Sequence, residues 1–276
     1  MLEKFTYTNH RGEVIYFGEA PYFASHSDLR DYKWKYDTDI TRFDRGTVQK
    51  TLEVIIVGSE ENANKAKDAL YEIIEKDVLA MKKGTFTIGE YKMNAFVYGS
   101  KKTNYLSNKK LLIVELDIVT DTPQWKKEKR FNFTANTDSE VVDLGRNYLE
   151  TRGYNYGYSY SKLNAEVHNN SFYKCGFRLR IDGPVTNPAI MIGENLYRVD
   201  VVVGTKDHLE IISDGTTKTI TLHKDGNVKI DCFANRYKKQ SVFAKIETGV
   251  HKVDWDNTFP FTLWLLIERS EPEWTL

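Results

Sequence analysis

Residues that could carry chemistry are numerous in this chain, but they do not stand at the spacings that catalysis or metal binding requires. The six histidines are scattered, and none lies at ligand spacing from another; they occupy positions 10, 26, 168, 208, 223 and 251. The sequence also lacks a glycine-rich phosphate loop and the His-Glu-x-x-His, Cys-x-x-Cys and Gly-x-Ser-x-Gly motifs. We therefore expect a protein that is not an enzyme and that needs no cofactor and no metal.

Carboxylates are the one group whose abundance leaves an enzymatic class open. With 39 Asp and Glu residues, a hydrolase that uses two close carboxylates in a cleft is compatible with the composition. The sequence marks no particular pair, and we rank a β-rich hydrolase last of three functional interpretations.

The two cysteines, Cys175 and Cys232, lie within alternating apolar runs. A disulfide framework would need more cysteines, and a zinc site would need partner ligands near each thiol. The sequence therefore predicts two free thiols buried in the core.

The overall composition excludes further classes. The 39 Lys and Arg residues balance the 39 acids, and a net charge of zero argues against a dedicated nucleic-acid binder. The longest apolar stretch, residues 261–267, is too short to cross a bilayer, and the first residues lack the apolar run of a signal peptide. Aromatic residues make up 13% of the chain, which is typical of pleated sheets and of large contact surfaces.

In the first half, short apolar runs predict strands at residues 14–17, 52–57, 85–88, 92–98 and 111–119, and Trp34 shares a face with Tyr36 in another short run. One segment changes period, because apolar residues recur every three or four positions from residue 60 to residue 83. Ser59 is expected to cap this amphipathic helix, Lys82 and Lys83 to occupy its last turn, and Gly84 to close it in a left-handed conformation.

The second half is almost wholly strand-like. Alternation places Cys175, Phe177, Leu179 and Ile181 on one face of a strand. Further strands are predicted at residues 189–192, 196–203, 209–212, 219–222, 228–233, 242–246, 250–255 and 261–267, with tight turns at residues 214–215 and 225–226. The fold class is therefore mainly β, with an N-terminal β-rich domain that has one helix (residues 1–130) and a C-terminal β-sandwich (residues 131–276).

A row of tyrosines precedes the second domain's strands. Tyr154, Tyr156, Tyr158 and Tyr160 recur with period two, so a strand would present them on one face. Such rows anchor protein interfaces, and they also stack on sugars or bases. No basic residue is interleaved, so we rank protein contact first, sugar second and nucleic acid third.

A series of short motifs runs through nearly the whole chain in a fixed order. The first half contains Asn9-x-x-Gly12-Glu13, Leu29-Arg30-Asp31-x-x-Trp34, residues 72–79 and residues 121–125. The second half contains the tyrosine row, residues 183–190, 197–199 and 218–220, and residues 268–274. In their order and spacing, these motifs resemble the distal tail protein (Dit) family of siphophages.

The resemblance implies a virion structural protein of the tail baseplate. The N-terminal domain would form a hexameric ring around the tail axis, and the C-terminal domain would be a galectin-like sandwich that points outward. The ring would join the tail tube to the tail-tip and receptor-binding apparatus used in host adsorption, and it would let DNA pass at ejection. The implied partners are further copies of the chain, the major tail tube protein, the tail-associated hub protein and receptor-binding or baseplate proteins. DNA would pass without specific binding, no membrane would be involved, and the protein would reach the virion tail tip after assembly in the host cytoplasm.

A carbohydrate-binding module on a support domain, aiding host adsorption, is the alternative. A galectin sugar site would place His two residues before Asn187-Pro188 and Arg directly after it, where this sequence has Val185 and Ala189. The resemblance to galectins would then be one of fold and not of sugar chemistry. Sugar binding through another face, such as the tyrosine row, stays open.

The end of the chain echoes residues 121–125, since both segments follow a strand and contain an acid, a proline and a tryptophan. Burying a side chain as large as Trp274 is worth roughly 2–3 kcal/mol. We therefore expect the last residues to return to the N-terminal domain and to bury Trp274 there. Trp274 and the four tyrosines of the row are the candidate interface residues.

Overall fold

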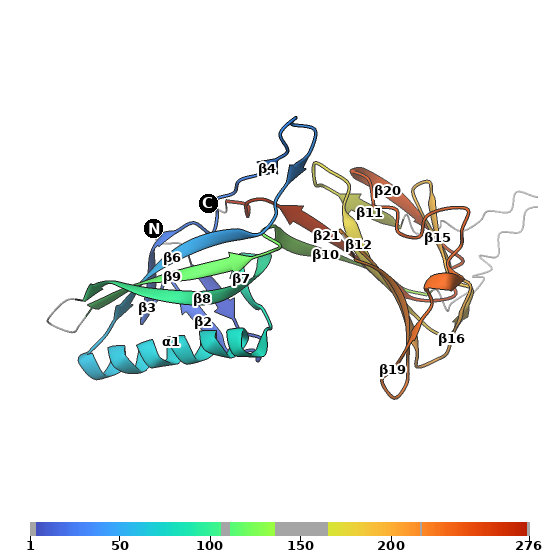
Figure 1. The fold of residues 1–276 in the computed structure, drawn as a ribbon. Helices are drawn as coiled ribbons and strands as arrows, with labels where there is room; N and C mark the ends of the chain where they lie inside the picture. The colour runs from blue at the N-terminus through green and yellow to red at the C-terminus, as the bar shows by residue number, and fades with distance from the viewer. Residues whose placement is uncertain (1–3, 106–110, 136–164, 216, 275–276) are drawn as a thin grey trace, which may run out of the picture. The chain divides into compact units, whose positions relative to one another are not determined.

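The computed structural model describes residues 4–105, 111–135, 165–215 and 217–274. The chain divides into two compact units, Met1–Lys127 with Glu268–Leu276, and Glu128–Ile267. Strands β10 (Trp125–Phe133) and β21 (Phe261–Arg269) carry the chain from one unit to the other. The predicted fold class is confirmed: the described chain is mainly β, and it has one α-helix, in the first unit (Figure 1).

The first unit contains two connected runs of antiparallel strands. One run has the order β2-β1-β7-β8-β10, and in the other β3 pairs with β6, β6 with β9, and β9 with β8. Besides β10, the strands in these two runs are β1 (Phe5–Thr8), β2 (Val14–Phe17), β3 (Tyr22–Ser27), β6 (Val48–Val57), β7 (Gly84–Ile88), β8 (Tyr91–Tyr105) and β9 (Leu111–Thr120). The strand predicted from the apolar run at residues 52–57 is confirmed as part of β6. The even-numbered residues of β6 from 50 to 56 are buried and the odd-numbered residues between them only partly, so one face of the strand lies in the core.

Helix α1 (Glu60–Ala80) packs Leu70 and Ile74 into the core of the first unit. The Ser59 side chain accepts a hydrogen bond from the Asn62 N–H, so the predicted cap is confirmed. The predicted end is wrong, because Met81 takes the left-handed conformation (φ 51°) three residues before Gly84. Lys82 and Lys83 therefore lie beyond the last turn of the helix.

Gly84 instead begins β7, beside a buried carboxylate. Asp77, near the end of α1, is fully buried and accepts hydrogen bonds from the Tyr7 hydroxyl (2.5 Å) and the His10 N–H (2.8 Å). A Cβ at position 84 would overlap Asp77 and the Tyr7 ring. Burial and the neighbouring Asp77 carboxylate raise the pKa of Tyr7 far above its usual value, so its hydroxyl remains a donor. Glycine is required here for close packing and not for a left-handed backbone.

The second unit is a sandwich of two antiparallel sheets around a common apolar core. The larger sheet has the order β19-β18-β17-β12-β21, and the smaller has the order β11-β20-β14-β15. The elements are β11 (Glu166–Asn169), β12 (Gly176–Asp182), β13 (Val185–Thr186), β14 (Ala189–Ile192), β15 (Asn195–Arg198), β16 (Val202–Val203), β17 (His208–Asp214), β18 (Thr217–Lys224), β19 (Val228–Asp231), the 3-10 turn η1 (Phe233–Asn235) and β20 (Gly249–Asp254).

Sequence patterns predicted most strands of this unit, but they predicted one strand where buried apolar residues belong to a loop. Both cysteines are buried thiols that form no disulfide, as predicted, and alternate residues of β12 face the core. The strand predicted at residues 242–246 is wrong. Val242 is buried within a loop, and Ile246 forms only an isolated bridge with Cys175, because these side chains fill the core without a neighbouring strand to pair with.

The close approach at Gly84 yields a prediction. Replacing Gly84→Ala forces Asp77 or the Tyr7 ring out of place, and we expect a loss of about 1–3 kcal/mol in the free energy of unfolding, measured by urea denaturation. The matched control is Gly58→Ala, since a Cβ there would meet its nearest atoms at 3.4 Å, an ordinary contact. Equal stability of the two variants would contradict the role assigned to Gly84.

Candidate self-association surface

The connection between β3 and β6 carries the most prominent exposed apolar surface of the first unit. It forms a small hairpin of β4 (Lys35–Tyr36) and β5 (Phe43–Asp44), which stands out from the β6–β9 sheet in Figure 1. Every residue from 31 to 44 is exposed. The exposed large apolar side chains are Tyr32, Trp34, Tyr36, Ile40 and Phe43. Clustered aromatic exposure of this kind marks an interaction surface, whereas single exposed apolar residues do not.

The tip of the hairpin is held in one shape by Asp37. Its carboxylate accepts hydrogen bonds from the Thr41 hydroxyl (2.5 Å) and the Thr41 N–H (2.7 Å), which hold the pKa of Asp37 below its usual value. The Tyr36 and Phe43 rings, paired across the strands, meet edge to face at 6.3 Å. A two-stranded hairpin is marginally stable by itself in water, so a partner that covers these rings would add stability.

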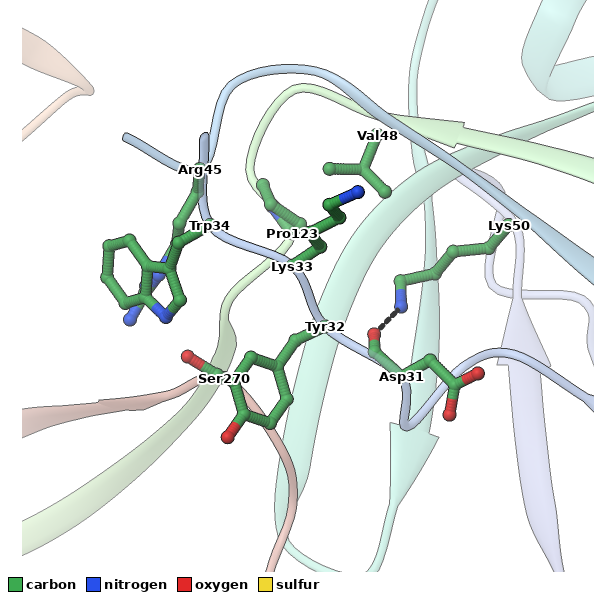
Figure 2. A pocket seen from close by; sticks show the side chains of 9 residues that line it. All are labelled: Asp31, Tyr32, Lys33, Trp34, Arg45, Val48, Lys50, Pro123 and Ser270. Carbon is green, nitrogen blue, oxygen red and sulfur yellow. Dashed lines mark hydrogen bonds between the residues drawn. The ribbon is translucent and has the colours of Figure 1, made fainter. Parts of the chain in front are cut away.

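The base of the hairpin depends on the buried side chain of Lys50 in β6. Lys50 is only 4% exposed, and its ammonium donates to the Asp28 carbonyl (2.8 Å). It also donates to the Asp31 carbonyl, as Figure 2 shows. Burial lowers the pKa of Lys50, and the Asp31 and Asp28 carboxylates oppose that shift. Lys50 thus fixes the turn from which the hairpin departs.

A shallow pocket lies beside this turn (Figure 2). Its lining consists of Asp31, Tyr32, Lys33, Trp34, Arg45, Val48, Lys50, Pro123 and Ser270. The Arg45 guanidinium lies 4.5 Å from the centre of the Trp34 ring, in cation–π contact. The Arg45 Nε is buried and has no hydrogen-bond partner among the described residues. The pocket therefore combines apolar walls with a donor that lacks an acceptor.

The segment after β21 belongs to the first unit and contributes Ser270 to this pocket. Arg30, with a side chain only 11% exposed, donates to the Pro272 carbonyl (2.8 Å) and lies over the Trp274 ring at 4.0 Å. The expected burial of Trp274 is wrong, since 72% of this residue is exposed. Its counterpart Trp125 is the one that is fully buried, and its Nε1–H donates to the Leu29 carbonyl (3.2 Å).

The structure describes only one of the five candidate interface residues that the sequence analysis named. The tyrosine row, Tyr154, Tyr156, Tyr158 and Tyr160, lies outside the described residues, and Trp274 stays a candidate as an exposed ring. Sequence reasoning noted the shared face of Trp34 and Tyr36 but did not identify the hairpin as a surface. The alternation of aromatic and charged residues from 32 to 36 was the available signal, and it is equally typical of a strand with one buried face.

Membrane-spanning helices and metal-binding clusters are both absent from the described part of the chain. No helix there is both long and apolar enough to cross a membrane. No cluster of three or more His, Cys, Asp or Glu side chains there is arranged to hold a metal ion.

The role of Lys50 can be tested by Lys50→Met. The substitution leaves the Asp28 and Asp31 carbonyls without their donor, at about 1–3 kcal/mol for each group that stays buried. We expect a lower Tm and faster chymotryptic cleavage within residues 32–45. Lys35→Met is the matched control, because Lys35 is exposed and its hydrogen bond to the Thr47 carbonyl (3.2 Å) is open to solvent. If both variants melt and cleave alike, Lys50 does not hold the base of the hairpin.

This chain is similar to known proteins in its three-dimensional structure and not detectably in its sequence. No protein-family model and no curated protein matches the sequence. A chain in the structure of the phage P2 baseplate in its activated conformation with calcium is 13% identical, with a TM-score of 0.57 over 99% of this chain and 100% of that chain. The SPP1 Dit protein, described as a paradigm of the hub adsorption apparatus in phages that infect Gram-positive bacteria, is 10% identical, with a TM-score of 0.58 over 96% of this chain and 99% of that chain. Over nearly its whole length, this chain has the fold of phage baseplate and Dit hub proteins, as the resemblance of its motifs predicted.

Proposed function

We propose that this protein is a structural distal tail, or baseplate hub, protein of a siphophage or a phage-tail-like particle. The observation that carries the proposal is the extent of the fold match, which covers 99% of this chain and 100% of the P2 baseplate chain. A match that includes both units and their connections is harder to reach by chance than a match of one common domain. The motif series found in the sequence supports the same assignment independently.

The proposed assembly is a hexameric ring in which the first unit makes the contacts between copies. A ring requires a heterologous interface, in which one patch of each copy meets a different patch of the next. The β4–β5 hairpin supplies an exposed aromatic patch with a preformed tip, as such an interface needs. The ring would join the tail tube to the hub and receptor-binding apparatus, at the tail tip of a virion assembled in the host cytoplasm.

Passage of DNA through the ring needs a lumen that does not bind it specifically. A net charge of zero provides no overall basic field that would retain the phosphate backbone. The role proposed here is therefore structural and not enzymatic, and the protein would act through its surfaces alone.

Carbohydrate binding by the second unit, the alternative function, finds less support. At the positions where a galectin site would have charged groups, Val185 and Ala189 are partly buried and carry only aliphatic side chains. They provide no donor for a sugar hydroxyl, so the sandwich supplies the scaffold without that chemistry.

Self-assembly is the first test. By light scattering, the intact chain should form a particle of about 190 kDa, six times 32.0 kDa, with a central opening in electron micrographs. Tyr36→Ser/Phe43→Ser, in the hairpin, should abolish it, whereas Phe172→Ser, an exposed aromatic of the second unit, should leave it intact. A monomeric wild-type chain at all accessible concentrations, or assembly that survives the hairpin variant and not Phe172→Ser, would contradict the proposal.

Galactoside binding is the second test. Because Val185 and Ala189 lack polar groups, we expect millimolar lactose to cause no site-specific shifts in an NMR titration of the intact protein. Maltose serves as the control for non-specific effects of sugar. Lactose-specific shifts centred on Asn187 would overturn the assignment of the second unit as a scaffold and favour the carbohydrate-binding alternative.

A further inference from the structure

The tip of the β4–β5 hairpin presents an apolar knob beside an exposed carboxylate. Ile40 has a φ of 54°, a region that β-branched residues rarely adopt, and 62% of the residue is exposed. The Asp37 carbonyl accepts from the Ile40 N–H (3.0 Å), and the Asp37 carboxylate is committed to Thr41. Asp39 is exposed beside Ile40. A strained residue that its neighbours hold in place and that is exposed to solvent points to a contact outside the chain.

The pocket at the base of the same hairpin has the complementary character. Its lining carries the cationic side chains of Lys33, Arg45 and Lys50 and one carboxylate, that of Asp31. The Lys50 ammonium already donates to two carbonyls, whereas the Arg45 Nε is buried and finds no acceptor among the residues that the structure describes. A buried donor without an acceptor destabilises the protein, and an incoming acceptor would remove that cost.

Tip and pocket cannot meet within one chain, because β4 and β5 hold them at opposite ends of one hairpin. We infer that Ile40 of one copy enters the pocket of the next copy, where Asp39 accepts a hydrogen bond from Arg45. The inference rests on the proposed self-assembly and specifies its contact. Each copy would donate one tip and offer one pocket, which is the head-to-tail pattern that closes into a ring.

Charge reversal tests this pairing in the intact protein. With Asp39→Lys or Arg45→Glu, like charges would face each other at every contact, and we expect assembly to weaken by about 100-fold or more. In an equimolar mixture of the two variants, every contact between unlike copies pairs opposite charges, so particles of wild-type mass should return. The double variant should also assemble alone. Glu194→Lys, on an exposed position of the second unit, is the control and should assemble as wild type.

The possible outcomes separate this inference from the function on which it rests. Recovery by mixing cannot result from misfolding of either variant, so it would establish the contact. If both single variants assemble as the wild type does, or if mixing restores nothing, the tip-to-pocket contact is wrong while self-assembly stands, and another molecule occupies the pocket. If the wild-type chain itself never assembles, the proposed function fails and the contact fails with it.

Discussion

A single buried ammonium group determines the geometry of the surface on which this protein's proposed role depends. Lys50 enters the interior of the first unit from β6 and binds the carbonyls of Asp28 and Asp31, in a position where an apolar side chain would leave those carbonyls unpaired. A charge taken out of water is costly unless hydrogen bonds or an opposite charge compensate for the lost hydration. This requirement allows few positions for the turn at residues 28–31. The hairpin, the pocket at its base and the Arg30 contacts with the C-terminal segment all start from that turn.

Buried polar side chains also attach segments that form no strand pairing at two other places in the described chain. Asp77 ties the end of α1 to β1 and the following turn through Tyr7 and His10. In the second unit, the side-chain amide of Asn169 donates hydrogen bonds to the carbonyls of Ile246 and Glu247, both at 3.0 Å. These bonds hold a loop that the sequence pattern predicts as a strand. Apolar burial supplies most of the stability, and these few buried polar groups select which loop lies where.

The distribution of exposed apolar groups agrees with a part that functions within an assembly. Tyr36, Ile40 and Phe43 are exposed on a hairpin whose turn is held by hydrogen bonds to Asp37, so these exposed side chains have a defined arrangement. A monomer gains nothing from such an arrangement, since its apolar rings contact water. In the proposed hexamer, a neighbouring copy would cover these aromatic side chains. It would also provide the packing partner that an isolated two-stranded hairpin lacks.

The amino-acid sequence by itself determined whatever depends on neighbours along the chain. Alternation identified β12, a short apolar run identified part of β6, and period and capping identified α1 from Ser59 onward. Tertiary structure decided the rest. Trp125 and Trp274 lie in similar motifs, yet one is buried and the other is exposed. Only Trp125 packs within the apolar core of the first unit, where its Nε1–H reaches the Leu29 carbonyl. In the same way, the alternation that includes Trp34 describes equally well a face turned to the core and a face turned to solvent. Periodicity records which side chains share a face, and only the packing of distant segments decides what that face touches.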